Sequence, residues 1–157
     1  MNVCRHLLPT AQRGRLRDPQ LASIRPLVDQ DLPRLAALVG SCRGHGGLGD
    51  AASARGLLGT LTGSEGRRPL AWLAERDAAA IAAIGLTGVT VASRVCWSIP
   101  FLIVAPDARR TGVGTSLVRV ALSEAAARGA TTVTAETLAT WPAADGFWRS
   151  VATLLEG

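Results

Sequence analysis

A glycine turn at residues 109–114 constrains the fold of this chain more than any other feature. Its sequence, Arg-Arg-Thr-Gly-Val-Gly, follows an apolar run and precedes apolar residues at helical spacing. The first N–H groups of a helix have no partner within the helix, and the helix dipole is positive there. Glycine lets a ligand approach the backbone without meeting a Cβ atom. We therefore expect the turn to join a strand to a helix and to hold an anion such as phosphate.

Two well-known phosphate-binding motifs do not fit this turn. The P-loop requires a lysine, and the chain contains none. The dinucleotide-binding fingerprint requires a third glycine three residues after the second, where this chain has Leu117. The pattern that remains is Arg109-x-x-Gly112-x-Gly114, preceded by Val-Ala-Pro at residues 104–106. An ordinary strand-to-helix turn is the alternative interpretation.

This pattern and the amphipathic helix predicted after it resemble motif A of the Gcn5-related N-acetyltransferases. The resemblance implies that the turn binds the pyrophosphate of acetyl-coenzyme A, the co-substrate, and that the preceding strand pairs with the pantetheine arm. It also implies acetyl transfer to a primary amine of a small molecule or peptide by direct attack. The residues assigned to the co-substrate in this way are Leu102, Ile103, Val104, Arg109, Arg110, Thr111, Gly112, Val113, Gly114 and Thr115.

The chain of 157 residues is predicted to form an α/β fold with one domain at residues 21–157. The resemblance implies a mixed, mostly antiparallel sheet flanked by helices. Alternating and apolar runs predict strands at residues 23–28, 69–75, 79–91, 95–104 and 131–137. Helices are expected after the acidic cap at residues 29–31, around residues 57–61 and at residues 112–128.

The C-terminal part departs from the family pattern. Phe147 and Trp148 align with an aromatic-Tyr pair, but Trp141 stands where the family has Asn. The C-terminal strands are therefore expected to be short or missing, with room for at most one strand at residues 153–156. The strand at residues 131–137 would then have an open edge, which a homodimer would cover.

Candidate catalytic residues come from the resemblance and from residue chemistry. The family's usual acid is the Tyr of the aromatic pair; this chain has no tyrosine, and the indole of Trp148 donates a hydrogen bond but no proton at neutral pH. Ser98 occupies the position of the glutamate base of histone-type members, and its hydroxyl is suited to orienting a water. Glu136, near a strand end, and His45, in a glycine-rich loop, are further candidate bases. Packing of Trp148 and simple solvent exposure of Glu136 and His45 are the alternatives.

Charge and cysteine content limit the other classes of function. The net charge of +5 suits an acidic ligand, but its one basic cluster lies at residues 1–20, predicted to be a disordered tail. No aromatic residues alternate with these arginines, which disfavours nucleic-acid binding. Three widely spaced cysteines indicate no metal site and a reducing, cytoplasmic setting, with Cys96 expected to be buried. No apolar run is long enough to span a membrane. A non-catalytic domain that binds acyl-coenzyme A remains the alternative function.

Overall fold

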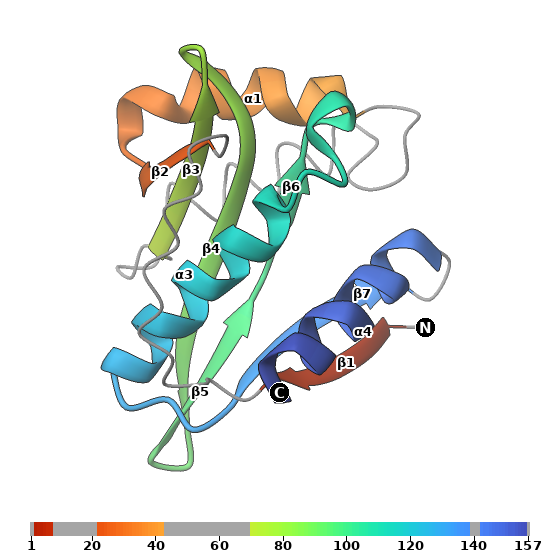
Figure 1. The fold of residues 1–157 in the computed structure, drawn as a ribbon. Helices are drawn as coiled ribbons and strands as arrows, with labels where there is room; N and C mark the ends of the chain where they lie inside the picture. Colours follow the sequence, from red (N-terminus) through yellow and green to blue (C-terminus); the bar gives the residue numbers. More distant parts are fainter. Residues whose placement is uncertain (1, 8–21, 43–69, 139–141, 157) are drawn as a thin grey trace.

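The computed structural model describes residues 2–7, 22–42, 70–138 and 142–156, and all structural statements refer to them. They form a seven-stranded sheet flanked by helices (Figure 1). The elements are β1 (Asn2–Leu7), β2 (Ser23–Pro26), α1 (Leu32–Ser41), β3 (Leu70–Arg76), β4 (Ala79–Val91), β5 (Arg94–Ile99), β6 (Leu102–Val104), α3 (Val113–Ala127), β7 (Val133–Leu138) and α4 (Pro142–Glu156). Short 3-10 helices at Asp29–Asp31 and Pro106–Ala108 precede α1 and the glycine turn.

The sheet is mixed, as predicted. Its strand order is β1-β7-β5-β4-β3-β2, with β6 paired to β4 beside this path. The pairing of β5 with β7 is parallel, and the other described pairings are antiparallel. The predicted α/β fold is confirmed, as are the strand at the start of the domain, the hairpin of β3 and β4, and the helix after the glycine turn.

The expected single strand at residues 95–104 is wrong, because it breaks at Pro100 into β5 and β6. Both strands pair with β4, but in different registers. Ser98 lies opposite Thr87, and Val104 lies opposite Ala82, so the β5–β6 side holds one residue more than β4 between these two pairs. Proline has no N–H to donate to a ladder and is tolerated at such a bulge. After the break, β6 stays with β4 while β7 continues past β5, so the two strands diverge.

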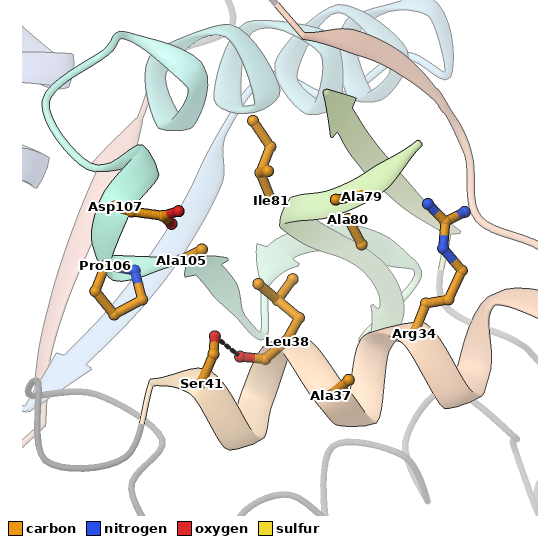
Figure 2. A pocket seen from close by; sticks show the side chains of 10 residues that line it. All are labelled: Arg34, Ala37, Leu38, Ser41, Ala79, Ala80, Ile81, Ala105, Pro106 and Asp107. Atoms are coloured by element: carbon orange, nitrogen blue, oxygen red, sulfur yellow. Dashed lines mark hydrogen bonds between the residues drawn. The ribbon is translucent and has the colours of Figure 1, made fainter. Parts of the chain in front are cut away.

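Helices cover both faces of the sheet. Figure 1 shows α3 and α4 on the same face. Figure 2 shows α1 on the opposite side of the first residues of β4 from α3. Apolar residues at helical spacing explain the packing of α3, because the side chains on one stripe are all buried. They are Leu117, Val118, Ala121, Leu122 and Ala125, each at most 2% exposed.

Two expectations about the chain ends are wrong. Residues 2–7, expected in a disordered tail, form β1, which pairs antiparallel with β7. A homodimer was expected to cover the open edge of β7, and β1 of the same chain covers that edge instead. Residues 153–156, expected as a short strand, belong to α4, where Phe147, Trp148 and Val151 continue a helical apolar period. The rest of the predicted tail, residues 8–20, and the helix predicted around residues 57–61 lie outside the described residues.

Candidate active site

The glycine turn has the backbone geometry of an anion site. It begins after the 3-10 helix at Pro106–Ala108 and ends where α3 starts at Val113. Arg110 has a φ of 62° and Gly112 a φ of 84°, so both adopt the left-handed conformation. That conformation is uncommon for an arginine, and strained residues of this kind cluster at ligand sites. Loops with such residues direct successive N–H groups into one concavity, where they bind anions.

The first turn of α3 adds further donors. The first helical hydrogen bond in this region runs from the N–H of Ser116 to the carbonyl of Gly112, at 3.0 Å. The amides of Val113, Gly114 and Thr115 precede it and therefore have no carbonyl partner four residues back within the helix. No side chain caps the helix at Gly112. These N–H groups and the positive end of the helix dipole together favour a phosphate.

Two side chains of the turn brace the loop. The hydroxyl of Thr111 donates to the carbonyl of Ala108 at 2.6 Å. The Nε of Arg109 donates to the carbonyl of Val104 at 3.3 Å and so ties the turn to the end of β6. The sequence predicted both residues as phosphate contacts, and the geometry gives each of them a positioning role as well. Arg110, also predicted, is exposed at the tip of the turn.

The two glycines of the motif meet different constraints. A Cβ on Gly112 would meet no atom within 4 Å, but its positive φ makes any side chain there strained. A Cβ on Gly114 would lie 3.2 and 3.4 Å from ring atoms of Phe147 and 3.5 Å from Val104 Cγ2. Gly114 therefore leaves room for the Phe147 ring of α4. Sequence reasoning missed Phe147 as a neighbour of the turn, because only the packing of α4 on α3 brings the two together.

The outer edge of β6 carries backbone groups that no other described strand pairs with. Gly85 donates its N–H to the carbonyl of Phe101 at 3.1 Å, and Ala105 donates its N–H to that of Ile81 at 2.8 Å. Because bonded pairs alternate along an antiparallel ladder, the backbone groups of Ile103 also face β4. The backbone N–H and carbonyl groups of Leu102 and Val104 point away from β4, and β6 pairs with no other described strand. Of the three predicted pantetheine contacts, Leu102 and Val104 are therefore the ones whose backbone groups face away from β4. The carbonyl of Val104 already accepts from Arg109 Nε and, at 3.5 Å, from Cys42 Sγ.

A cavity of about 570 Å³ adjoins the loop after β6 (Figure 2). Its lining is mainly apolar and comes from α1, the start of β4 and residues 105–107. Arg34 borders it, but donates to the carbonyl of Ala78 at 2.6 Å and to the carboxylate of Glu75. The lining of the cavity on β4 ends at Ile81, whereas Ser98 lies opposite Thr87. Six residues of strand, about 20 Å, separate Ile81 from Thr87. The cavity therefore lies far from Ser98, beside the residues that lead into the glycine turn.

A sequence model described as the acetyltransferase (GNAT) family matches residues 52–152. The chain belongs to this family. Similar solved structures include an aminoglycoside 6'-N-acetyltransferase from Acinetobacter haemolyticus, at 21% identity and a TM-score of 0.63, covering 82% of this chain and 88% of that one. A ribosomal-protein-alanine N-acetyltransferase from Brucella melitensis is 16% identical with a TM-score of 0.67, covering 85% and 92%. No curated protein matches the sequence.

These structures are too distant in sequence to show more than a shared fold, and the family match identifies an acyltransferase. The described helices include none that is both long and apolar enough to cross a membrane. Among the described residues, no group of three or more His, Cys, Asp or Glu is placed to hold a metal ion.

The candidate GNAT catalytic residues occupy different places. Ser98 lies on β5, opposite Thr87 of β4 and Thr134 of β7, just before the strands diverge. Glu136 is the first residue of β7 beyond the parallel pairing with β5, and its register partner is Cys4 of β1. The register of β5 with β7 thus places Ser98 and Glu136 near each other, at the point where the strands begin to diverge. His45 lies outside the described residues.

Trp148 is a core residue, and its burial favours the packing interpretation. It is 6% exposed and belongs to the main apolar cluster. Its ring meets that of Phe147 edge to face, with centroids 5.0 Å apart. Such aromatic pairs stabilise the packing of a helix without any role in proton transfer. Cys96, expected to be buried, is instead exposed on β5, because β7 begins opposite Trp97 and leaves the first residues of β5 uncovered on that side.

An ion-pair network fixes α1 against the sheet. Arg25 of β2 donates two hydrogen bonds of 2.7 Å to Asp31 and two of 2.9 and 3.2 Å to Glu75. The hydrogen bonds from Arg25 lower the pKa of Asp31 to about 2, although burial opposes this. Arg25 and then Arg34 likewise hold the pKa of Glu75 below its usual value. Glu75 is therefore an ion-pair partner in this structure, unsuited to act as a base.

Proposed function

We propose that this chain transfers the acetyl group of acetyl-coenzyme A to a primary amine by direct attack in a ternary complex. The observation that carries the proposal is a pair of backbone sites joined by one short loop: the edge of β6 that faces away from β4, and the first amides of α3 after the left-handed turn at Arg110 and Gly112. A pyrophosphate fits the turn, and an arm containing amides fits the strand edge. The membership of the GNAT family supports this assignment.

The reaction needs little covalent help from the protein. The amine nitrogen forms a bond to the acyl carbon, the carbon–sulfur bond breaks, and its electron pair passes to sulfur. The acceptor ammonium loses one proton before attack and a second as the amide forms, and the released thiolate takes one up from solvent. Holding both reactants in attacking geometry supplies much of the rate. Since Trp148 is buried and its indole N–H is not acidic, we assign protonation of the thiolate to water.

The acceptor that we propose is a primary amine of a small molecule or peptide. Similar structures carry the names of enzymes that acetylate aminoglycosides or the alanine of a ribosomal protein, and these give the first compounds to try. We also propose a cytoplasmic setting, since the cysteines at positions 42 and 96 are both free thiols.

A second candidate function is binding of acyl-coenzyme A without turnover. The burial of Trp148, which occupies the position of the family's usual acid, favours it. The two functions share the co-substrate site and differ only in chemistry.

One experiment separates these functions. Calorimetric titration with coenzyme A measures binding, and release of free thiol from acetyl-coenzyme A measures transfer to an aminoglycoside, a polyamine and a peptide with N-terminal alanine. Binding together with thiol release that depends on one of the amines supports the transferase. Binding with no amine-dependent release supports the second function, and no binding contradicts both.

A further inference from the structure

The hydroxyl of Thr87, on the central strand β4, is buried and has no hydrogen-bond partner among the described residues. Burying a hydroxyl without a partner destabilises a protein, and most native structures avoid it. Where such a group persists, a bound water or a functional role is the usual physical reason. Sequence reasoning gave Thr87 no role, and its one signal is a single hydroxyl in the otherwise apolar stretch of β4 at residues 79–89.

The register places two more hydroxyls beside it. A Cβ on Gly88 would lie 3.1 to 3.2 Å from the ring of Trp97, so these opposite residues share one face of the sheet. Their neighbours Thr87 and Ser98 are also opposite each other and share the other face. Thr134 of β7 lies opposite Ser98 and extends the row across a third strand. Side chains of opposite residues have Cβ atoms about 5 Å apart, a spacing that one water can bridge.

The surroundings of this hydroxyl row (Thr87, Ser98 and Thr134) favour a held water. Phe101 is buried, and its ring lies where a Cβ on Gly85 would be, two residues from Thr87 along β4. An apolar ring therefore borders the row on the same face. Thr134 already donates to the carbonyl of Trp97 at 3.4 Å, so its hydroxyl oxygen retains lone pairs to accept another hydrogen bond. Ser98 is only half-buried, which gives the row a route to solvent.

The row also lies where the chemistry would occur. Ser98 and Thr134 form the second-to-last pair of β5 with β7, and beyond it β6 and β7 diverge. A Cβ on Gly114 of α3 would lie 3.5 Å from Val104, which is opposite Ala82, so Ala82 shares the face of α3 and Thr87, five residues further along β4, lies on the other face. Helix α1 packs on that other side of the sheet (Figure 2). An acceptor that approaches from the side of α1 therefore reaches the divergence of the strands next to the hydroxyl row.

We propose that Thr87 and Ser98 hold one water molecule, with Thr134 beside Ser98 at the end of the row, and that this water relays the proton of the acceptor ammonium to solvent. The proposal rests on the transferase function above. The water accepts one proton from the nitrogen and passes one of its own protons outward, so it is regenerated while the amine becomes nucleophilic. Thr87 is a positioning residue in this scheme, because it acts through the water.

The kinetic test replaces Thr87 by Val, which keeps the shape and removes the hydroxyl. We expect Thr87→Val to melt close to the temperature of the wild type, because the hydroxyl bonds no described residue and its removal gives up only the bond to the water. Its kcat should fall at least tenfold, the KM for acetyl-coenzyme A should stay within twofold, and the rise of rate with pH should move to higher pH. Thr87→Ser should restore most of the rate. Thr90→Val, on an exposed part of the same strand, is the matched control and should leave kcat unchanged.

A crystallographic test does not depend on turnover. In a high-resolution structure of the wild type, a water should lie within hydrogen-bond distance of Thr87 Oγ1 and Ser98 Oγ, and it should be absent from Thr87→Val. A dry wild-type site overturns the proposal, as does Thr87→Val with wild-type kcat and pH profile. A wild type that transfers acetyl to no amine contradicts the transferase function instead, while the crystal structure still decides whether the hydroxyls hold a water.

Discussion

At the scale of single residues, the glycine turn combines two requirements that look alike in the sequence. Gly112 is needed for its left-handed backbone, whereas Gly114 is helical and leaves space for Phe147. A motif of two glycines two residues apart therefore does not show that both serve the ligand. Only Gly112, with open space where a Cβ would point, leaves its backbone approachable from outside the protein.

Replacing Gly114 by Ala should destabilise the fold by about 1–2 kcal/mol, because the Phe147 ring must move a few tenths of an ångström in a packed site. Chemical denaturation of the wild type, Gly114→Ala, Phe147→Leu and the double variant measures this. With the smaller Leu at position 147, the cost of Gly114→Ala should fall by at least half. An equal cost in both backgrounds would show that Phe147 is not the constraint.

At the scale of the elements, the sequence predicted those helices and strands that depend on residues close together in the chain. The helix α3 and the hairpin of β3 and β4 follow from apolar periodicity, a cap and a short turn, all close in sequence. The break at Pro100 was missed because residues 95–104 form one apolar run, and the bulge exists only relative to the register of β4. Strand β1 was missed because its partner, β7, lies at the other end of the chain.

Removal of residues 1–7 should uncover the edge of β7. Unpaired strand edges associate with other chains, so the truncated protein should show an average mass that rises with concentration. Size-exclusion chromatography with light scattering measures this against the full chain. If the truncated protein keeps the mass and the unfolding free energy of the full chain, β1 does not protect that edge.

The network around Asp31 joins β2, β3 and α1 and gives stability a specific pH dependence. The pKa of Asp31 is lowered to about 2 in the folded chain, against about 3.9 when unfolded. A depressed carboxyl pKa stabilises the fold above the unfolded value, and this stabilisation is lost as pH falls from about 4 to about 2.

Asp31→Asn should therefore lower the unfolding free energy at pH 7 and flatten its fall between pH 5 and pH 2. Urea titrations at each pH measure both effects. Asp77→Asn, in the exposed turn between β3 and β4, controls for the loss of one negative charge. Parallel curves for Asp31→Asn and the wild type would show that the ion pairs with Arg25 contribute no acid-sensitive stability.

At the scale of the whole molecule, the site is built where two strands separate. The bulge at Pro100 commits β6 to β4, β7 stays with β5, and the glycine turn follows the end of β6. The sequence was sufficient to predict the turn and the family, because the glycine motif is contiguous. It was not sufficient for the hydroxyl row, which draws one residue from each of three strands and depends on register.

The measurement that most directly tests the binding of acetyl-coenzyme A at the turn compares variants of the two glycines that flank α3. Gly112 and Gly129 flank the helix with nearly equal φ values of 84° and 83°, and a Cβ on either would meet no atom within 4 Å. Gly112→Ala and Gly129→Ala should thus carry the same backbone cost, about 1–2 kcal/mol of stability. In calorimetric titrations with coenzyme A, we expect Gly112→Ala to bind at least tenfold more weakly than the wild type and Gly129→Ala to bind as the wild type does. Equal affinities for the two variants would contradict phosphate binding at the turn.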